Sequence, residues 1–478
     1  MGFDPTAPEY DLSEIREKLS KQEGRTFWRS LDEVADTPEF RSFLNAEFPA
    51  AVDSLTSSLD RRQFLKLMGA SIAMSGLSAC TKQPIEKILP YVKQPEDLLP
   101  GQPLYYATAF PLGRSAFPVL VESHMGRPTK IEGNPEHPAS YGSTNSFTQA
   151  SVLDLYDPDR SQSIWRAGQP MPGENFTAEV NAVIEKQKTV QGAGLRFLTE
   201  PSISPTFAAT MKKVLEALPQ ARWHQWEAVG HENEREGALL AFDRPVEPRY
   251  DFRTADVIVS FDGDFLYDGP GQIRYTKDFI ARRKIDDPAL QMNRLYSVES
   301  TPTVTGGKAD HRLPLSPSHV AAAIRLLGAE VGVGVAAPKG LDANAEAWIK
   351  AAAKDLVAHK GTGLVLAGPS QDATVHALCH AINSRLGNAG RTVIYTEPVE
   401  EVPPVAADGI ATLATDMHAG KVEALIMLGG NPVYEAPPDM DFAGALSKVA
   451  FTVHVASHND ETSRLCLWHL PAAHYLES

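Results

Sequence analysis

The segment EALIMLGGNP, residues 423–432, contains an apolar run that ends at two glycines. A short apolar run bounded by turn residues predicts a buried strand, and the glycines predict a tight turn after it. A similar segment, DVIVSFDGD, occupies residues 256–264. Each segment leads through a helical pattern to a second strand and then to a short strand that contains Leu-Pro. These later strands are expected at residues 451–457 and 467–471 in one copy and at 294–300 and 312–315 in the other. The sequence therefore predicts two copies of one nucleotide-binding type of unit.

The turns after these strands supply the candidate binding residues. Parallel units of this kind place ligands at the carboxyl ends of their strands, where a glycine turn lets backbone amides approach a phosphate. The candidate cofactor-binding residues are therefore Gly263, Gly429, Gly430 and Asn431. Tight strand-to-helix turns need the same glycines when no ligand is present. A nucleotide-binding protein that uses the turns at Gly263 and Gly429 is one alternative function.

Apolar strands alternate with helical patterns of about 10–15 residues through most of the chain. This alternation predicts an α/β fold with mainly parallel sheets, which we expect as two Rossmann-like units. We assign one unit to residues 190–330 and the second, apparently truncated, to residues 340–478. Shorter alternating segments predict a small β module at residues 104–165. The prolines of residues 81–103 predict an extended linker before it.

The N-terminal part contains an export signal. Arg61 and Arg62 precede a weakly hydrophobic run that ends in Leu-Ser-Ala-Cys at Cys80. An arginine pair in this context is typical of the twin-arginine route, which exports folded proteins, and the run is shorter than the roughly 20 residues that span a bilayer. We therefore assign residues 61–80 to a twin-arginine signal and residues 1–60 to an extended presequence. A chance arginine pair on an amphipathic helix is the alternative. Cys80 is a lipidation candidate, and an unmodified thiol is the alternative there.

Charge and cysteine content exclude several classes of function. The net charge of -15 would repel nucleic-acid phosphates, so no nucleic-acid partner is expected. The chain has three cysteines, Cys80, Cys379 and Cys466, and no Cys-x-x-Cys pair. Neither a four-thiolate iron–sulfur cluster nor a common zinc site can be built from them. Cys379 and Cys466 lie in apolar patterns and are expected to be buried.

The motifs as a set resemble the molybdopterin oxidoreductase family. GNPEHP at residues 133–138 and LYDPDR at residues 155–160 resemble the family's N-terminal module. LGGNP at residues 428–432 and LPAA at residues 470–473 resemble its later strand-turn element and its Leu-Pro-Ala signature. The matches together extend from about residue 104 to residue 478. The resemblance implies a fold with two Rossmann-like units that, in active members, holds a molybdenum cofactor.

The chain departs from the family where the family does chemistry. Active members usually carry three closely spaced cysteines on the first β module and a fourth downstream. The matching region here has Tyr105, Ala109, Gly113 and Ser115. The resemblance therefore implies that the proximal iron–sulfur cluster cannot form.

The family also holds its metal through a protein Ser, Cys, selenocysteine or Asp. The matching window, WEAVGHEN at residues 226–233, contains none of these. We therefore expect no catalytic residue, no metal ligand and no molybdopterin in this chain. An active molybdenum or tungsten oxidoreductase that uses an unusual ligand, Glu232 or His231, is the alternative.

The presequence narrows the resemblance further. WRSL at residues 28–31, PEF at residues 38–40 and EFP at residues 47–49 resemble a group with an extended twin-arginine region, typified by the large iron–sulfur subunit of alternative complex III. This resemblance implies a membrane-associated respiratory complex that oxidises quinol at the periplasmic face of the inner membrane. Its implied partners are multihaem cytochrome c and quinol-oxidising membrane subunits. In that subunit the iron–sulfur clusters belong to a C-terminal half, which we expect beyond Ser478, so this chain is predicted to be the structural, molybdoenzyme-like half.

Overall fold

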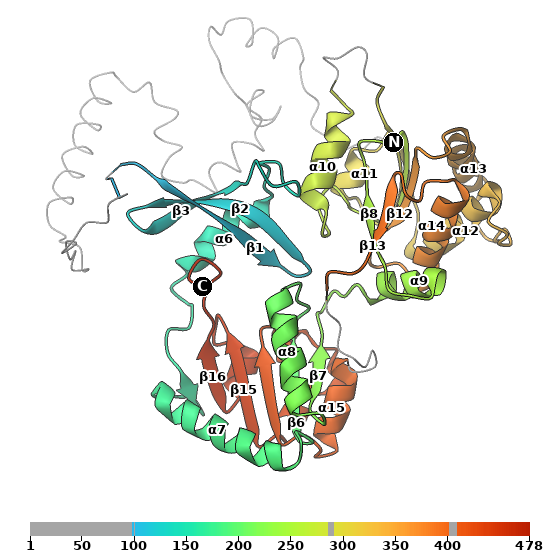
Figure 1. Cartoon of the computed structure of the whole chain (residues 1–478). Coiled ribbons are helices and arrows are strands. Elements are labelled where there is room, and N and C mark those ends of the chain that lie inside the picture. The colour runs from blue at the N-terminus through green and yellow to red at the C-terminus, as the bar shows by residue number, and fades with distance from the viewer. Residues whose placement is uncertain (1–97, 100, 285–290, 401–408) are drawn as a thin grey trace, which may run out of the picture. The chain divides into compact units, whose positions relative to one another are not determined.

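The two predicted strand and glycine-turn units lie in two different sheets of the computed structural model (Figure 1). The structure describes residues 98–99, 101–284, 291–400 and 409–478. The predicted α/β class is confirmed, because the central strands of both sheets pair in parallel.

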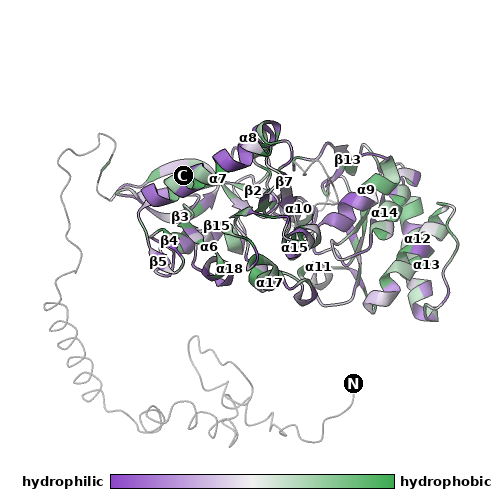
Figure 2. Ribbon diagram, turned by 90° about the horizontal axis from the view of Figure 1, so that it is seen from below, coloured by the Kyte–Doolittle hydropathy of each residue, from purple (hydrophilic) through white to green (hydrophobic). Residues whose placement is uncertain are grey.

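The first unit forms a four-stranded parallel sheet. Its strands lie in the order β11 (His311–Pro314), β10 (Arg294–Glu299), β9 (Val257–Phe261) and β12 (Gly363–Ala367). Helices α12 (Pro317–Val331), α13 (Ala343–Ala358) and α14 (Ala373–Arg385) bury their apolar sides against one face. Helix α10 (Gln272–Ala281) and the antiparallel pair β8 (Glu247–Tyr250) and β13 (Val393–Thr396) pack on the other. Figure 2 shows hydrophobic and hydrophilic residues side by side on α12 and α13, as expected for helices with one buried side.

Local capping signals explain where these helices begin. Helix α12 begins with Pro317, a residue whose fixed φ suits the first helical position. Helix α13 begins after Asp342, whose side chain accepts a hydrogen bond from Ala345 N.

The second unit lies in a seven-stranded sheet. Its strands lie in the order β5 (Gln169–Pro170), β4 (Trp165–Arg166), β16 (Trp468–Pro471), β15 (Phe451–Ala456), β14 (Ala424–Leu428), β6 (Leu195–Thr199) and β7 (Arg222–Gln225). Helices α7 (Gly173–Thr189) and α8 (Pro205–Ala217) pack on one face. The other face is covered by α15 (Ile410–His418) and α17 (Phe442–Leu446). The short helices α16 (Pro432–Glu435), η1 (Pro438–Met440) and α18 (Glu461–Leu465) complete the unit.

The predicted ranges 190–330 and 340–478 do not correspond to the two sheets. Strands β6 and β7 come from the first range but pair in the sheet of β14, and β12 comes from the second range but pairs with β9. The chain therefore crosses between the sheets and returns. Periodicity identifies a strand, but it does not specify which of two sheets the strand joins. Strand β13 lies outside both sheets, because it pairs with β8 in a separate two-stranded sheet.

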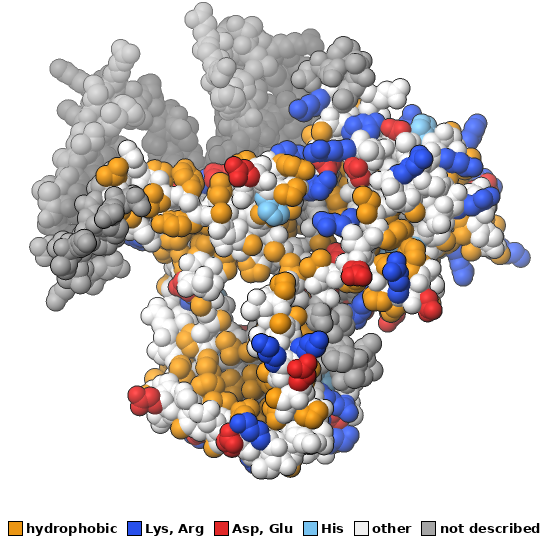
Figure 3. Space-filling view, in the orientation of Figure 1, with side chains coloured by type: hydrophobic (Ala, Val, Ile, Leu, Met, Phe, Trp, Pro, Cys, Tyr) orange, Lys and Arg blue, Asp and Glu red, His pale blue; other side chains and the backbone are white. Residues whose placement is uncertain are grey.

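The β module is a three-stranded antiparallel sheet within the predicted residues 104–165. It consists of β1 (Leu104–Leu112), β2 (Ser115–His124) and β3 (Arg127–Gly133), and helix α6 (Ser146–Leu155) packs on β3. Its small core contains Val119, Val121, Ile131 and Val152. Figure 3 shows hydrophobic side chains gathered along this sheet, and Tyr105 and Tyr106 of β1 are each more than half exposed.

The predicted export signal, with Arg61, Arg62 and Cys80, lies outside the described residues. None of the helices in the described ranges is both long and apolar enough to cross a membrane.

Candidate functional site

The turns after β9 and β14 have the same backbone hydrogen bond. Asp262 N donates to Val298 O at 2.8 Å, and Gly429 N donates to Val455 O at 2.9 Å. Both residues have positive φ angles, 50° at Asp262 and 74° at Gly429. The left-handed residue of the first turn is therefore Asp262 and not the predicted Gly263. Gly263 is required for a different reason, because a Cβ there would lie 2.6 Å from Leu366 Cδ1.

A second set of hydrogen bonds repeats in the two units. Asp264 Oδ1 accepts from Thr305 N at 2.8 Å, and Asn431 Oδ1 accepts from Thr462 N at 3.2 Å. The hydroxyl of Thr305 accepts a hydrogen bond from the backbone N–H two residues after Asp264, at Leu266. The hydroxyl of Thr462 accepts one from the backbone N–H two residues after Asn431, at Val433. The predicted internal similarity is therefore present down to single hydrogen bonds.

In the first unit, the protein's own carboxylate occupies the turn. Asp262 Oδ1 accepts from Ser300 N at 2.7 Å and from Ser300 Oγ at 3.1 Å, and Oδ2 accepts from Gln371 Nε2 at 2.9 Å. These are donors of the kind that hold a phosphate at the carboxyl end of a strand. Because the carboxylate of Asp262 accepts these hydrogen bonds, a negatively charged group already lies at the turn.

In the second unit, Glu200 covers the glycine turn. This residue follows β6, and a Cβ on Gly429 would lie 2.5 Å from its Oε2. The Gly430 backbone hydrogen-bonds to the Glu200 carboxyl. Partial burial and the neighbouring Glu435 raise the pKa of Glu200. The carboxyl group lies where an anionic ligand of Gly429 and Gly430 would bind.

The predicted turn residues therefore do not fit a phosphate-bearing cofactor. A phosphate at either turn would compete with a carboxyl group for the same donors and would be repelled by its charge. The side chain of Asn431 is also hydrogen-bonded within the protein, since its Nδ2 donates to Glu461 Oε2 at 2.7 Å. The four predicted candidates lie at equivalent turns, as expected, but internal side chains take their hydrogen bonds.

The turn between β1 and β2 carries Arg114, in the region where the family resemblance implied cysteines. Arg114 lies between Gly113 and Ser115, and its Nε donates to Glu400 Oε2 at 2.7 Å. Its Nη1 lies 3.7 Å from Glu234 Oε2. A guanidinium and two carboxylates therefore link the β module to α9 (Glu232–Phe242) and to the segment after β13.

The predicted alternative metal ligands belong to this cluster. His231 Nδ1 lies 2.9 Å from Glu234 Oε2, and this hydrogen bond raises the pKa of His231. Burial alone would raise the pKa of Glu234, but the hydrogen bond from His231 and nearby positive charge lower it overall. Glu232 lies apart from this pair, because its carboxylate lies over Gly230.

The donor set of the described residues does not fit a metal. Over residues 98–99, 101–284, 291–400 and 409–478, no group of three or more His, Cys, Asp or Glu is arranged to hold a metal ion. Cys379 and Cys466 are buried as predicted. Burial raises the pKa of both thiols, that of Cys466 to about 12. Both cysteines are therefore thiols, not thiolates, near neutral pH.

A cavity of about 120 Å³ lies beside the Arg114 cluster, and we call it the Glu247 cavity. Its wall comes from the start of β8, the turn after β9, the end of β12 and helix α14. Helix α9 contacts α14 closely because Gly237 has no side chain, since a Cβ there would lie 2.4 Å from His376 Cβ. No sequence motif marks this cavity, because its residues come from separate segments. The side chains that line it include Glu247, Tyr250, Phe265, Tyr275 and His376.

Comparisons with known proteins agree with the fold. No protein-family model matches the chain. The menaquinone reductase, molybdopterin-binding-like subunit of Nitratidesulfovibrio vulgaris is 27% identical over 471 residues, which is 88% of this chain. This chain spans 66% of that relative's length. The solved structure of acetylene hydratase from Pelobacter acetylenicus superposes with a TM-score of 0.55 and 13% identity, covering 76% of this chain and 62% of that one. The fold is of the molybdopterin oxidoreductase type, and the similarities support a molybdopterin oxidoreductase-like family.

Proposed function

We propose that this chain is a structural, molybdoenzyme-like subunit of a membrane-associated, quinone-linked electron-transfer complex. In this role it binds neither a molybdenum cofactor nor an iron–sulfur cluster and provides a folded body on which redox subunits assemble. The observation that carries the proposal is that a carboxyl group of the protein lies at each turn. Asp262 accepts the hydrogen bonds at the turn after β9, and Glu200 lies against Gly429 at the turn after β14.

The Arg114 cluster supports the same proposal. A cluster site would need thiolates near Gly113 and Ser115, and Arg114 with its two carboxylate partners lies there instead. An electron-transfer chain needs redox centres separated by short gaps. A pterin-bound metal in this chain would have no neighbouring cluster on its own β module.

We further propose that the complex to which this chain belongs is of the alternative complex III type. The presequence resemblance implies quinol oxidation, whereas the relative from Nitratidesulfovibrio vulgaris is named for menaquinone reduction. Both involve a quinone and several subunits, so we propose quinone-linked electron transfer as the shared role. Multihaem cytochrome c, iron–sulfur and quinone-binding membrane subunits are the proposed partners. The proposed location is the periplasmic face of the inner membrane, reached by the twin-arginine route.

Metal and pterin analysis tests the absence of a cofactor. The chain would be purified from its native host grown with molybdate and then with tungstate. Inductively coupled plasma mass spectrometry and the fluorescence of oxidised pterin should show only trace amounts of either. One molybdenum or tungsten atom per chain, together with pterin, would overturn the proposal.

Fractionation tests export and assembly. The wild-type chain should be found in the periplasmic or membrane fraction, and a variant with Arg61→Lys and Arg62→Lys should stay in the cytoplasm. Arg41→Lys, which lies outside the predicted signal, is the matched control. Mild-detergent isolation should recover the chain with c-type haem absorbance and quinol or quinone turnover. Isolation of a monomer that carries no redox partner would contradict the assembly role.

A further inference from the structure

We propose that the Glu247 cavity binds a small organic cation, a guanidinium or a primary ammonium group, that donates a hydrogen bond to Nε2 of His376. This inference goes beyond the structural role above and concerns residues that the role does not use. It follows from an unpaired acceptor, an excess of carboxylates and aromatic walls in one small cavity.

His376 is the acceptor within the cavity. The residue is only 6% exposed, and its Nε2 has no hydrogen-bond partner among the residues that the structure describes. Burial lowers the pKa of His376, so its imidazole is neutral near pH 7. The backbone of Gln371 and Gly368 and the carboxylate of Glu234 oppose this lowering only in part. In the neutral tautomer with its proton on Nδ1, the unpartnered Nε2 accepts a hydrogen bond from a ligand N–H, and this is the tautomer that the proposal requires.

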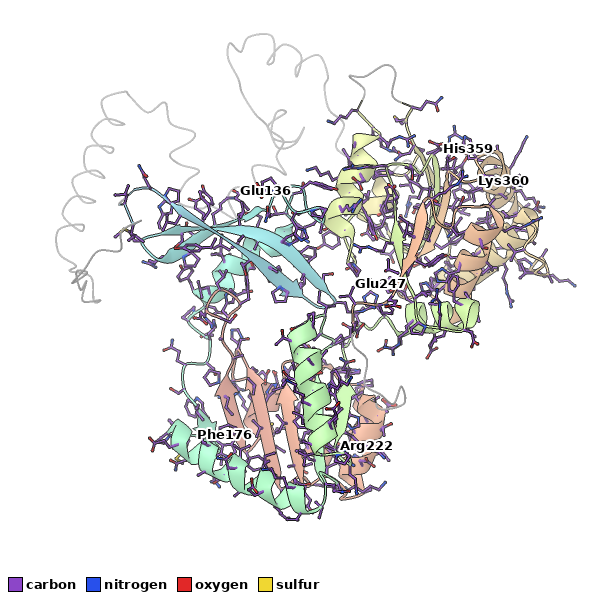
Figure 4. All side chains as sticks on the ribbon, viewed as in Figure 1. Glu136, Phe176, Arg222, Glu247, His359 and Lys360 are labelled. Carbon is purple, nitrogen blue, oxygen red and sulfur yellow. The ribbon has the colours of Figure 1, made fainter. Side chains whose placement is uncertain are left out.

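The charges that line the cavity favour a cation. Arg114 and His231 also line it, but both are paired, with Glu400 and Glu234. The carboxylate of Glu247, which begins β8 (Figure 4), has no cation within ion-pair distance among the described residues.

Two further carboxylates line the same wall. Among the described residues, the side chain of Asp264 accepts a hydrogen bond from Thr305 N, and that of Asp268 accepts one from Gly269 N. Within the described ranges neither carboxylate has a cation at ion-pair distance, so together with Glu247 they leave an excess of negative charge. A phosphate or carboxylate ligand would be repelled, and a cation would be attracted.

Aromatic side chains complete a site for a small cation. Tyr250, Phe265 and Tyr275 line the cavity, and the ring of Tyr275 lies over Gly271. Cations are attracted to aromatic faces, which is how proteins recognise ammonium groups. A cavity of about 150 Å³ holds benzene, so about 120 Å³ is enough for a methylguanidinium or ethylammonium ion.

Calorimetric titration of the full chain tests the inference at constant ionic strength. Methylguanidinium and ethylammonium chloride should show saturable binding, and sodium acetate and phosphate should show none. Glu247→Gln and His376→Gln should each weaken cation binding at least about tenfold, the usual scale for loss of a charged or buried hydrogen-bond partner. Glu346→Gln, on the exposed side of α13, is the matched control and should bind as the wild type does.

The same titration separates two sources of the cation. If the cation is a free metabolite, the small ion alone should bind. If it is a side chain of a partner subunit, a short peptide that contains arginine or lysine should bind. The small ions and such peptides are therefore titrated in parallel. Saturable binding of either, lost in the two cavity variants, supports the inference. No binding of any cation by the folded protein, equal affinity in Glu247→Gln, or preferential binding of phosphate would overturn it.

Discussion

Arg114 and Glu400 are 286 residues apart in the chain, and a hydrogen bond of 2.7 Å joins their side chains. Both side chains are largely buried, at 16% and 9% exposure. The bond links the turn of the β module to the segment that follows β13. An electrostatic contact therefore connects the β module to a segment that is remote from it in the sequence.

Replacing Arg114 should test this link. Arg114→Met leaves Glu400 without its cation in a buried position, so the free energy of unfolding should fall by about 2 kcal/mol, a value reduced for the partial exposure of the pair. Urea unfolding measures it. Lys188→Met removes an exposed ion pair with Glu185 and should change stability by less than about 0.5 kcal/mol. Equal stability of Arg114→Met and the wild type would show that the link does not stabilise the fold.

The equivalence of the two turns makes a paired prediction. Thr462 accepts from Val433 N, and Thr305 accepts from Leu266 N, with both threonines fully buried. Valine has the same shape but leaves the buried N–H unpaired, so each Thr→Val variant should lose about 1–3 kcal/mol of stability. Thr415→Val, at an exposed helix position, should lose less than about 0.5 kcal/mol. A loss at only one of the two turns would contradict their equivalence.

Sequence pattern predicted the elements of the fold but not the exchange of strands between sheets. The run at residues 424–428 is apolar and ends at glycines, so its strand and turn follow from local chemistry. Its neighbours β6 and β15 are separated from each other by more than two hundred residues, and any of several apolar strands satisfies the same pattern. Strand partners depend on tertiary packing, which periodicity does not encode.

The candidate site shows the same limit. Gly429 was predicted correctly as a turn residue, because only glycine adopts its φ easily. The side chains that cover the turns, Asp262 and Glu200, carry no motif that marks them as ligand mimics. Glu247 and His376 also meet only through folding, so a single sequence provides no spacing that would reveal the cavity.

The pH dependence of stability should depend on His380. Burial lowers the pKa of His380 to about 4, and its Nδ1 hydrogen-bonds to Tyr395. The unfolded chain binds a proton near pH 6.5, so the folded state is at full stability above that pH and loses stability as the pH falls toward 4. The loss attributable to this group is about 3 kcal/mol.

A variant isolates that contribution. His380→Gln should make urea-unfolding midpoints less dependent on pH between 7 and 4.5 than those of the wild type. His376 and Glu234 also act on His380, with opposite signs, and both remain in the variant. His319→Gln, exposed on α12, should keep the wild-type slope. An unchanged slope in His380→Gln would show that another group causes the acid sensitivity.

The buried cysteines should be unreactive in the folded protein. Burial raises the pKa of Cys379 and Cys466, so neither is a thiolate at pH 8. A Cys80→Ser protein should show no reaction with Ellman's reagent until it unfolds, and then two thiols. Rapid labelling of the folded variant would contradict the burial and would reopen thiolate ligation as a possibility.

Glycine replacement distinguishes backbone strain from the contact with Glu200. Gly429 and Gly420 have similar φ angles, 74° and 70°, but a Cβ at Gly420 has no atom within 4 Å, whereas one at Gly429 meets Glu200. Gly420→Ala should cost about 1 kcal/mol from backbone strain alone, and Gly429→Ala should cost about 1 kcal/mol more, because the hydrogen-bonded carboxyl of Glu200 must also move. Adding Glu200→Ala to Gly429→Ala should recover the difference, as unfolding by urea would show. Equal costs in the two single variants would mean that Glu200 does not occupy the turn.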